Sequence, residues 1–530
     1  MDYRVLDSAD GAGLTRRRLL QAGATAGVGS VVLSACGSGS RSASSTGAQA
    51  TGSDKPVRGG QLRVGVSGGR TSDVLNPLNV ISSMELACAR QLFNSLVAFD
   101  ANAVVKPALA EELEPSKDAR TWTVKLRPGV TFHDGRELTA DDVIYTMKRI
   151  VNPKEPQAGA NALASLDANA MRKRDKLTVE LPFKAPFSSL RDLLPCYYFY
   201  IVPVGFDPKK PIGTGPFKLD SFTPGQEARF SRHEGYWERG KPYLDAVVMT
   251  NFADETAEIN ALAGGQINAA ALLSSDAISQ LQAAKKVVSV SPGGGFNPIV
   301  MRTDVAPFKD VRVRQAIRLL TDREQMLKLV FGGQGTIGND VFSPWDQHAE
   351  LPQRKADVEQ ARSLLKAAGQ EGATLTMVTS PIAQGSVKTA QVLAEQAAGA
   401  GLKIKLRQIT ATDFYSSGYL RYPFAQDYWT YFPYLPQVGF ATLPGAPYNA
   451  THFDDARYTQ LYKEGLATVD EARRNELVAE MQKIDYEKGG YLIPYFPPTI
   501  DGVGPNVRGL QKSKAGVPMG EWALANLYLT

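Results

Sequence analysis

Helix-like and strand-like patterns alternate along most of this chain, and that alternation limits the possible fold more than any other feature. Residues 121–127 alternate apolar and polar side chains, as a half-buried strand does. Thr139 and Asp142 then have the spacing of a capping box that begins a helix, and the same spacing recurs at Thr321 and Glu324. No repeat of solenoid length is visible. The sequence therefore predicts a mixed α/β or α+β protein.

Composition is typical of a globular protein, with 43% hydrophobic and 21% charged residues in a chain of 530. That length is enough for two or three domains. The formal net charge of +5 is small for this length, and no basic run stands out. We therefore predict no nucleic-acid partner.

The N-terminal region has the features of an export signal. An apolar run over residues 19–35 is broken by glycines and is short for a membrane-spanning helix. We interpret it as a targeting segment and exclude it from the fold. The arginines that precede it, with Arg16 and Arg17 as the pair, are similar to a twin-arginine signal.

The end of that segment is similar to a lipobox, because residues 33–36 read Leu-Ser-Ala-Cys. In a lipobox the Cys36 thiol would receive diacylglycerol and become the mature N-terminus. The alternative is an ordinary signal peptide with an incidental cysteine. We predict a signal peptide over 1–35, a flexible Gly/Ser-rich tether over 36–56, and an extracytoplasmic protein held at the cell membrane by its N-terminal lipid.

Two short motifs are typical of enzymes but lie in the wrong context. Residues 333–338 satisfy G-x-G-x-x-G, yet they follow a predicted helix, whereas a dinucleotide site requires a preceding strand. Residues 65–69 satisfy G-x-S-x-G around Ser67, and a polar loop follows where a nucleophile elbow requires a helix. A secreted serine hydrolase that uses Ser67 remains an alternative hypothesis.

Other catalytic and metal-binding patterns are missing from the sequence. The chain has four histidines, and none has a partner at zinc-ligand spacing. We predict no catalytic residues, no metal and no cofactor. Cys88 and Cys196 follow the predicted lipidation site, and the sequence leaves open whether they form a disulfide or stay free.

Four blocks of sequence carry a family resemblance: residues 109–150, 213–249, 307–335 and 458–496. In this order they resemble the signature segments of the extracytoplasmic solute-binding proteins of ABC importers, family 5, the class with dipeptide-, oligopeptide- and nickel-binding members. The resemblance implies a receptor that captures a small-molecule or peptide ligand and delivers it to an ABC permease in the membrane. It also implies a monomer without enzymatic activity.

The implied fold is α/β and periplasmic-binding-protein-like, with two lobes that close on a ligand around a hinge. An extra domain is inserted in the first lobe. On this sequence we place lobe I at 57–98, 210–296 and 499–530, the extra domain at 99–209, and lobe II at 297–498. These names are kept below for these ranges.

The resemblance also implies which residues line the ligand cleft. They would come from the loop after the first strand, from the hinge, and from a late segment of lobe II. On this sequence they are Thr71, Asp73, Asn76, Phe296, Asn297, Asp427, Trp429, Thr430, Tyr431 and Phe432.

This chain departs from the family pattern at one functional position. Peptide binders of the family usually have an aspartate a few residues after a tryptophan, and it pairs with the ammonium group of the peptide. Here no acid follows Trp429 before residue 438, and Asp427 precedes it.

Three interpretations stay open at this point. A peptide or peptide-like solute could be anchored by Asp427 or Asp73 instead. The aromatic cluster could bind a sugar, an aromatic compound or a cation. The aromatic residues could also simply form core. The tyrosine-rich residues 196–203 are predicted to pack in the core or beside the hinge.

Overall fold

The computed structural model describes residues 55–530. The predicted export signal with Arg16 and Arg17, the predicted lipidation site Cys36, and all but the end of the tether lie outside the described residues. Within residues 55–530, no helix combines the length and the apolar character that crossing a bilayer requires.

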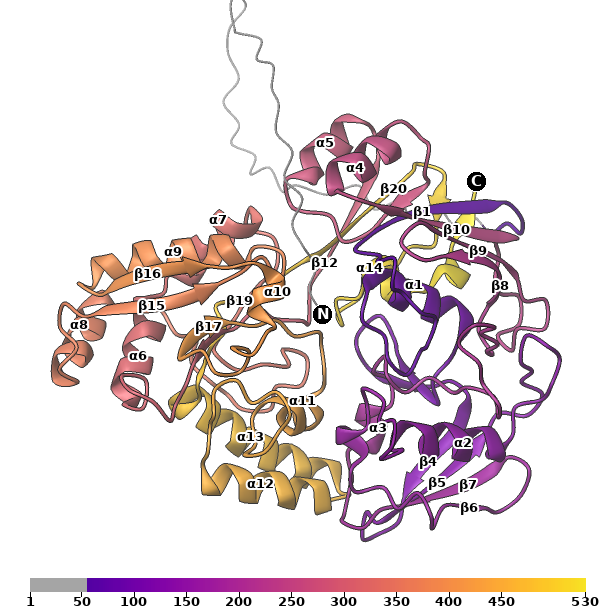
Figure 1. Cartoon of the computed structure of the whole chain (residues 1–530), viewed down its shortest axis with the longest axis horizontal. Helices are drawn as coiled ribbons and strands as arrows, with labels where there is room; N and C mark the ends of the chain where they lie inside the picture. The colour runs from indigo at the N-terminus through magenta and orange to yellow at the C-terminus, as the bar shows by residue number, and fades with distance from the viewer. Residues whose placement is uncertain (1–54) are drawn as a thin grey trace, which may run out of the picture. The chain divides into compact units, whose positions relative to one another are not determined.

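Lobe I contains a mixed sheet of seven strands in the described chain, in the order β12-β20-β11-β1-β10-β9-β8 (Figure 1). The first strand, β1, runs parallel to both of its neighbours, whereas the outer pairs are antiparallel. The strands are β1 (Gln61–Ser67), β8 (Phe217–Thr223), β9 (Glu227–Arg232), β10 (Ala246–Phe252), β11 (Ala269–Ala270), β12 (Val287–Ser291) and β20 (Thr499–Val503).

Helices cover both faces of this sheet. On one side α4 (Glu255–Ala263) and α5 (Ala277–Ala283) form one apolar cluster, and on the other α1 (Ser83–Leu92) and α14 (Pro518–Trp522) belong to the largest cluster. Two short pairs follow: β2 (Val97–Phe99) with β3 (Val105–Pro107) at the boundary between lobe I and the extra domain, and β21 (Val507–Arg508) with β22 (Tyr528–Leu529) in lobe I.

The extra domain is built on an antiparallel sheet in the order β4-β5-β7-β6. Its strands are β4 (Ala110–Pro115), β5 (Thr121–Leu126), β6 (Arg172–Lys173) and β7 (Thr178–Pro182), and its helices are α2 (Ala140–Ile150) and α3 (Leu190–Leu193). The predicted alternation in β5 is confirmed by its burial. The predicted start of α2 is also confirmed, because Asp142 accepts a hydrogen bond from the Thr139 N–H at 2.9 Å.

Lobe II combines three small sheets with most of the helices of the described chain. Its strands are β13 (Ile299–Met301), β14 (Thr336–Ile337), β15 (Thr374–Thr379), β16 (Lys403–Gln408), β17 (Phe424–Gln426), β18 (Tyr491–Leu492) and β19 (Tyr495–Phe496). Its helices are α6 (Val311–Leu320), α7 (Arg323–Phe331), α8 (Val358–Ala367), α9 (Ser386–Gly399), α10 (Ala411–Phe414), α11 (Tyr434–Ala441), α12 (Ala456–Ala467) and α13 (Glu471–Lys488).

One predicted helix start in lobe II is wrong by one residue. The N-cap of α7 is Asp322, whose carboxylate accepts from the Gln325 N–H at 2.9 Å. Thr321 instead donates its hydroxyl to the Ile317 carbonyl in the preceding helix. The carboxylate at the next position therefore takes the capping role.

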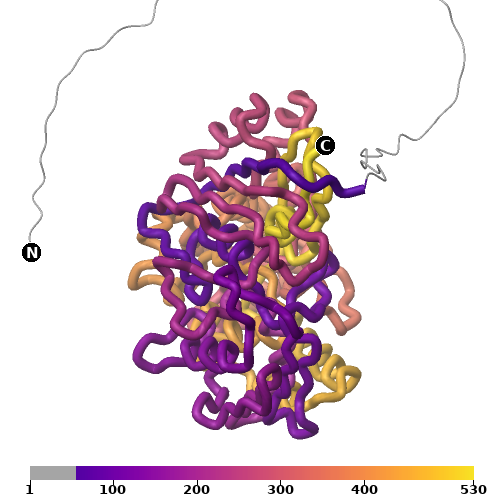
Figure 2. Tube along the Cα trace, turned by 90° about the vertical axis from the view of Figure 1, so that its right-hand side faces the viewer, coloured from indigo at the N-terminus to yellow at the C-terminus, as the bar shows by residue number. Residues whose placement is uncertain are grey.

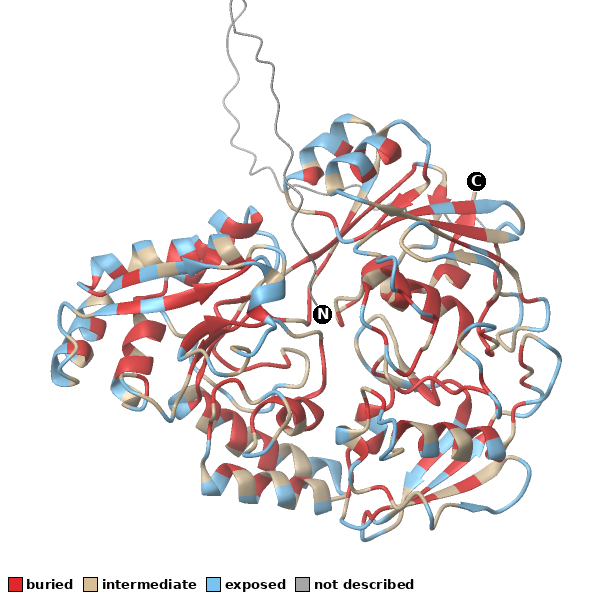
Figure 3. Cartoon of the chain, in the orientation of Figure 1, coloured by how far each residue is buried: buried red, intermediate tan, exposed pale blue. Residues whose placement is uncertain are grey.

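The chain crosses between the two lobes at two adjacent places. Ser291 and Thr499 are register partners at the ends of β12 and β20, so both crossings leave the sheet side by side. Gly293 lies so close to the second crossing that a Cβ atom there would be 1.8 Å from the Pro497 carbonyl oxygen. The C-terminal part of the chain thus returns to lobe I, as the trace in Figure 2 shows, and the crossing strand β20 is buried throughout (Figure 3).

Candidate functional site

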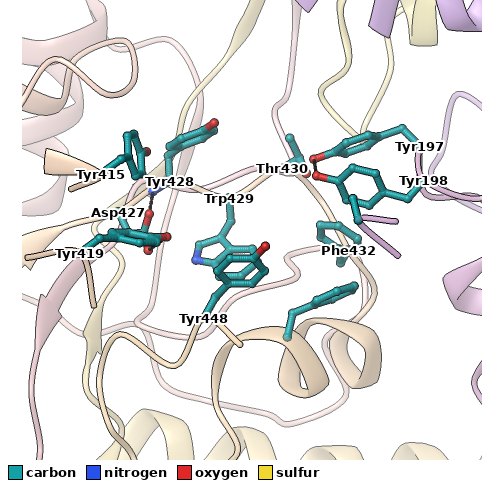
Figure 4. Close-up of a pocket in the computed structure, with 12 residues that line it drawn as sticks. Tyr197, Tyr198, Tyr415, Tyr419, Asp427, Tyr428, Trp429, Thr430, Phe432 and Tyr448 are labelled. Atoms are coloured by element: carbon teal, nitrogen blue, oxygen red, sulfur yellow. Dashed lines mark hydrogen bonds between the residues drawn. The ribbon is translucent and has the colours of Figure 1, made fainter. Parts of the chain in front are cut away.

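A pocket lies between the extra domain and lobe II, with about 720 Å³ of space free of protein atoms (Figure 4). One wall comes from the extra domain and the other from residues 415–448 of lobe II. The lining residues are Ala158, Tyr197, Tyr198, Tyr415, Tyr419, Asp427, Tyr428, Trp429, Thr430, Phe432, Phe440 and Tyr448. Aromatic rings dominate the surface, and a single carboxylate interrupts it.

The late segment of lobe II reaches this pocket because it is held by a strand and then by the hinge. β17 pairs with β13, and the chain continues from β17 into Asp427. Two residues later Trp429 and Phe296 exchange backbone hydrogen bonds in both directions, each 2.9 Å long. This bridge ties a pocket residue directly to the first crossing between the lobes.

Side chains of that segment point in different directions. Trp429, Thr430 and Phe432 line the pocket. The Tyr431 ring instead packs edge-on against Phe99 of the extra domain, with ring centroids 5.6 Å apart, and borders a different cavity. The structure therefore brings four of the five predicted residues of this segment together and places Tyr431 elsewhere.

Asp427 is the only ionisable acid or base among the lining residues other than the tyrosines. It is 3% exposed and accepts hydrogen bonds from the Tyr428 N–H at 2.9 Å and the Tyr419 hydroxyl at 3.3 Å. Within the described residues no Lys, Arg or His side chain forms an ion pair with it. Burial raises the pKa of Asp427 to about 7, and the two hydrogen bonds oppose that rise.

Tyrosines surround this carboxylate in Figure 4. Tyr415 and Tyr428 are 43% and 46% exposed, which is a large fraction for aromatic residues that border a cavity. The Tyr415 and Tyr419 rings meet edge-on with centroids 5.0 Å apart. In the middle of the pocket the indole of Trp429 meets the Tyr448 ring edge-on, with ring centroids 5.9 Å apart.

The extra domain contributes two tyrosines that sequence reasoning assigned to the core or the hinge. Phe199 and Tyr200 are buried, as predicted for residues 196–203. Tyr197 and Tyr198 are half-buried and line the pocket, and the Tyr198 hydroxyl donates to Tyr197 at 3.1 Å. That interpretation is therefore corrected for these two residues.

The predicted residues from the loop after β1 do not line the pocket. Thr71 is exposed. Asp73 is buried and already occupied, since it accepts from the Ser82 hydroxyl at 2.7 Å and pairs with Arg70 at 3.2 Å. Asn76 donates its side-chain amide to Gln157 at 3.0 Å.

The predicted hinge residues, Phe296 and Asn297, do not line the pocket. Phe296 is buried in the core of lobe II, stacked on Phe342. Asn297 donates to the Gln384 carbonyl and borders a second cavity of about 620 Å³. Trp429 and Thr430 line both cavities, so the two cavities adjoin at these residues.

The enzyme-like motifs have structural surroundings that differ from those of catalytic sites. The glycine-rich residues 333–338 follow α7 and contain the short strand β14. Ser67 ends β1 and donates its hydroxyl to Glu258 at 2.6 Å, and the next helix begins only at Ser83. Within residues 55–530 no group of three or more His, Cys, Asp or Glu side chains could hold a metal ion.

Both remaining cysteines, Cys88 and Cys196, are buried and free. Burial raises the pKa of each thiol. The open question of a disulfide is thereby answered in favour of two reduced core residues.

Comparison with known proteins shows which family this chain belongs to. The family model described as bacterial extracellular solute-binding proteins, family 5, middle region, matches residues 104–450. The chain belongs to this family. The match includes every residue that lines the pocket and confirms the resemblance for the first three of the four sequence blocks.

Two curated relatives match at 28% and 30% identity. The glutathione-binding protein GsiB of Pectobacterium atrosepticum is 28% identical over 367 residues, which cover 65% of this chain and 68% of that protein. The oligopeptide-binding protein AppA of Bacillus subtilis is 30% identical over 368 residues, which cover 64% of each chain.

Solved structures confirm the periplasmic-binding-protein-like fold. The binding protein AgaA from A. tumefaciens R10, solved in complex with agropinic acid, superposes with a TM-score of 0.76. It is 24% identical, and the match covers 89% of this chain and 99% of AgaA. This likeness establishes the two-lobed α/β fold for this chain.

Proposed function

We propose that this chain is the lipid-anchored substrate-binding protein of an ABC importer, which captures a solute outside the cytoplasm and delivers it to a membrane permease. Membership of family 5 supports the receptor role. The single observation that carries the proposal is the pocket, because residues of the extra domain and residues of lobe II line it together.

The domain division given above is part of the same proposal. Lobe I, the extra domain and lobe II keep the ranges given above, and the two crossings beside Gly293 and Pro497 would act as the hinge. A ligand that contacts both walls would favour a closed arrangement. Export by the twin-arginine route and lipidation of Cys36 remain proposals from sequence.

The solute is peptide or peptide-like by default, since GsiB and AppA are named for glutathione and oligopeptides. A non-peptide solute is the alternative, because the position where the family's ammonium-binding aspartate would lie is occupied by aromatic residues. Of the ten predicted contacts, we retain Asp427, Trp429, Thr430 and Phe432 for the solute itself.

Native mass spectrometry of the purified full chain tests the receptor role. We expect a bound small molecule, released on denaturation, at one copy per chain. Added solutes of the correct class should also raise the melting temperature. A protein that releases nothing, and that no peptide, amine, sugar or organic acid stabilises, would contradict the proposed function.

A further inference from the structure

The pocket presents a charge without a counter-charge. Asp427 is almost fully buried, and its hydrogen-bond donors are one backbone N–H and one phenol. The other lining residues include no Lys, Arg or His. The second cavity, which adjoins at Trp429 and Thr430, is lined by no ionisable residue at all.

A buried carboxylate is costly in its ionised form unless it is paired with a positive charge. Because Asp427 lines the pocket, a cationic solute can reach it and supply that charge. The surrounding rings fit the same partner. The face of a tyrosine or tryptophan ring is electronegative and attracts an ammonium group within about 6 Å of its centre. Tyr415, Tyr419 and Tyr428 stand around the carboxylate, and two of them expose much of their surface.

We propose that this pocket binds the ammonium group of its solute, with Asp427 as the counter-ion and Tyr415, Tyr419 and Tyr428 as an aromatic cage. This inference rests on the proposed receptor function and specifies its ligand chemistry. The anchor lies two residues before Trp429, on the side where the chain leaves β17.

A second consequence follows from the missing cations. A free dipeptide carries a carboxylate as well as an ammonium group, and neither cavity offers a Lys, Arg or His side chain to receive it. Burying that carboxylate without a partner would oppose binding. The site therefore prefers a cation over a zwitterion, so that a peptide amide or a simple organic amine binds more tightly than the free peptide.

Titration calorimetry on the purified full chain tests this proposal with four probes: choline, dialanine, dialanine amide and N-acetyl-dialanine. We expect dialanine amide to bind more tightly than dialanine. N-acetylation, which removes the positive charge, should weaken binding by about 30-fold or more. Tighter binding of choline than of the amide would identify a non-peptide cation as the source, and the reverse order would identify a peptide amino terminus.

Two variants distinguish the loss of the ammonium site from a general loss of the fold. Asp427→Asn keeps the shape of the side chain and removes its charge, and we expect about a 30-fold loss of affinity for the best cation. Asp485→Asn is the matched control, because Asp485 is also buried and held by two tyrosine hydroxyls but does not line the pocket. Melting temperatures of both variants check that the fold is kept.

The outcomes distinguish this inference from the receptor role. Equal affinity for dialanine and its N-acetyl form, or unchanged binding by Asp427→Asn, overturns the ammonium site. Binding of a neutral sugar or an organic acid, with no amine bound, overturns the ammonium site and leaves the receptor role intact. Binding of no solute of any class contradicts the receptor role itself.

Discussion

Burial and the proposed cation binding have opposite effects on the protonation of the Asp427 carboxylate. Burial favours its protonated form, and its pKa of about 7 places the two forms near balance at neutral pH. A cation that enters the pocket pairs only with the ionised form. Binding therefore has to be coupled to loss of the Asp427 proton.

This coupling predicts a pH dependence of affinity. Tyr415, Tyr419, Tyr428 and Tyr491 face Asp427, and their raised pKa values keep these phenols neutral in this range. Choline keeps its charge at every pH. Its affinity should therefore fall roughly tenfold between pH 8 and pH 6, as Asp427 becomes protonated. Calorimetry at three pH values measures it, and an affinity that stays level would count against Asp427 as the counter-ion.

Tyr428 allows the aromatic cage to be tested without a large effect on folding, because its ring is 46% exposed. Tyr428→Ala should weaken cation binding about fivefold, the value of one ring face. Tyr428→Phe keeps the ring and should bind nearly as the parent chain does. Both should change the free energy of unfolding by less than about 0.5 kcal/mol. Equal losses in the two variants would indicate that the hydroxyl, not the ring, contacts the solute.

Sequence reasoning found the residue-scale site in part. Asp427 stands out in the sequence because the aspartate that the family usually has after the tryptophan is absent here. Trp429, Thr430 and Phe432 belong to the same segment and were predicted with it. Tyr415 and Tyr419 lie in a loop without periodicity, so no pattern marked them. Asp73 was an equal candidate on sequence, and only the structure shows that Ser82 and Arg70 already occupy its oxygens.

At the scale of elements, a local capping signal predicts the start of a helix correctly when only one residue can be the N-cap. It fails when a neighbouring residue can cap the helix as well. Thr139 has no competing cap, and α2 begins there as predicted. Thr321 is followed by Asp322, which caps α7 instead. The order of the large sheet was not predictable from local pattern, because β20 joins β12 and β11 from more than two hundred positions along the chain.

The two crossings can approach each other closely because Gly293 has no side chain. Gly293→Ala would place a methyl group 1.8 Å from the Pro497 carbonyl oxygen, which is backbone and cannot rotate away. We expect a loss of about 2–4 kcal/mol in the free energy of unfolding, together with weaker solute binding. Gly399→Ala, near the end of α9, is the control, since nothing lies within 4 Å of the added methyl group. Denaturant unfolding compares the variants, and equal stability would contradict the close approach.

Across the whole molecule, buried carboxyls set the pH dependence of stability. Asp427, Asp485 and Asp501 are buried, and burial raises the pKa of each to about 7. The unfolded chain has ordinary values near 4, so the folded form binds more protons between these limits. Stability therefore falls as pH rises through that window. The half-buried His133 and the buried His233 act oppositely below pH 6.5, because desolvation lowers the pKa of each.

We accordingly expect the free energy of unfolding of the protein without solute to be higher at pH 6 than at pH 8, by about 1 kcal/mol per carboxyl. The protein should therefore unfold at a higher temperature at pH 6. Thermal unfolding at pH 6, 7 and 8 measures this trend. Asp485→Asn should flatten it, since one titrating group is lost. A melting temperature that rises with pH over this range would show that the three carboxyls are ionised in the folded state.

Contact between the two walls continues beyond the pocket. Ser188 of the extra domain donates its N–H to the Leu466 carbonyl and its hydroxyl to the Gly465 carbonyl, each at 2.8 Å, at the end of α12. These carbonyls end a helix and would accept from water equally well, so exchanging Ser188 for solvent costs little. A solute that touches both walls, as proposed above, would then determine whether the walls are apart or together. Closure and occupancy become one equilibrium, and a permease that recognises only the closed form would respond to solute concentration without contacting the solute.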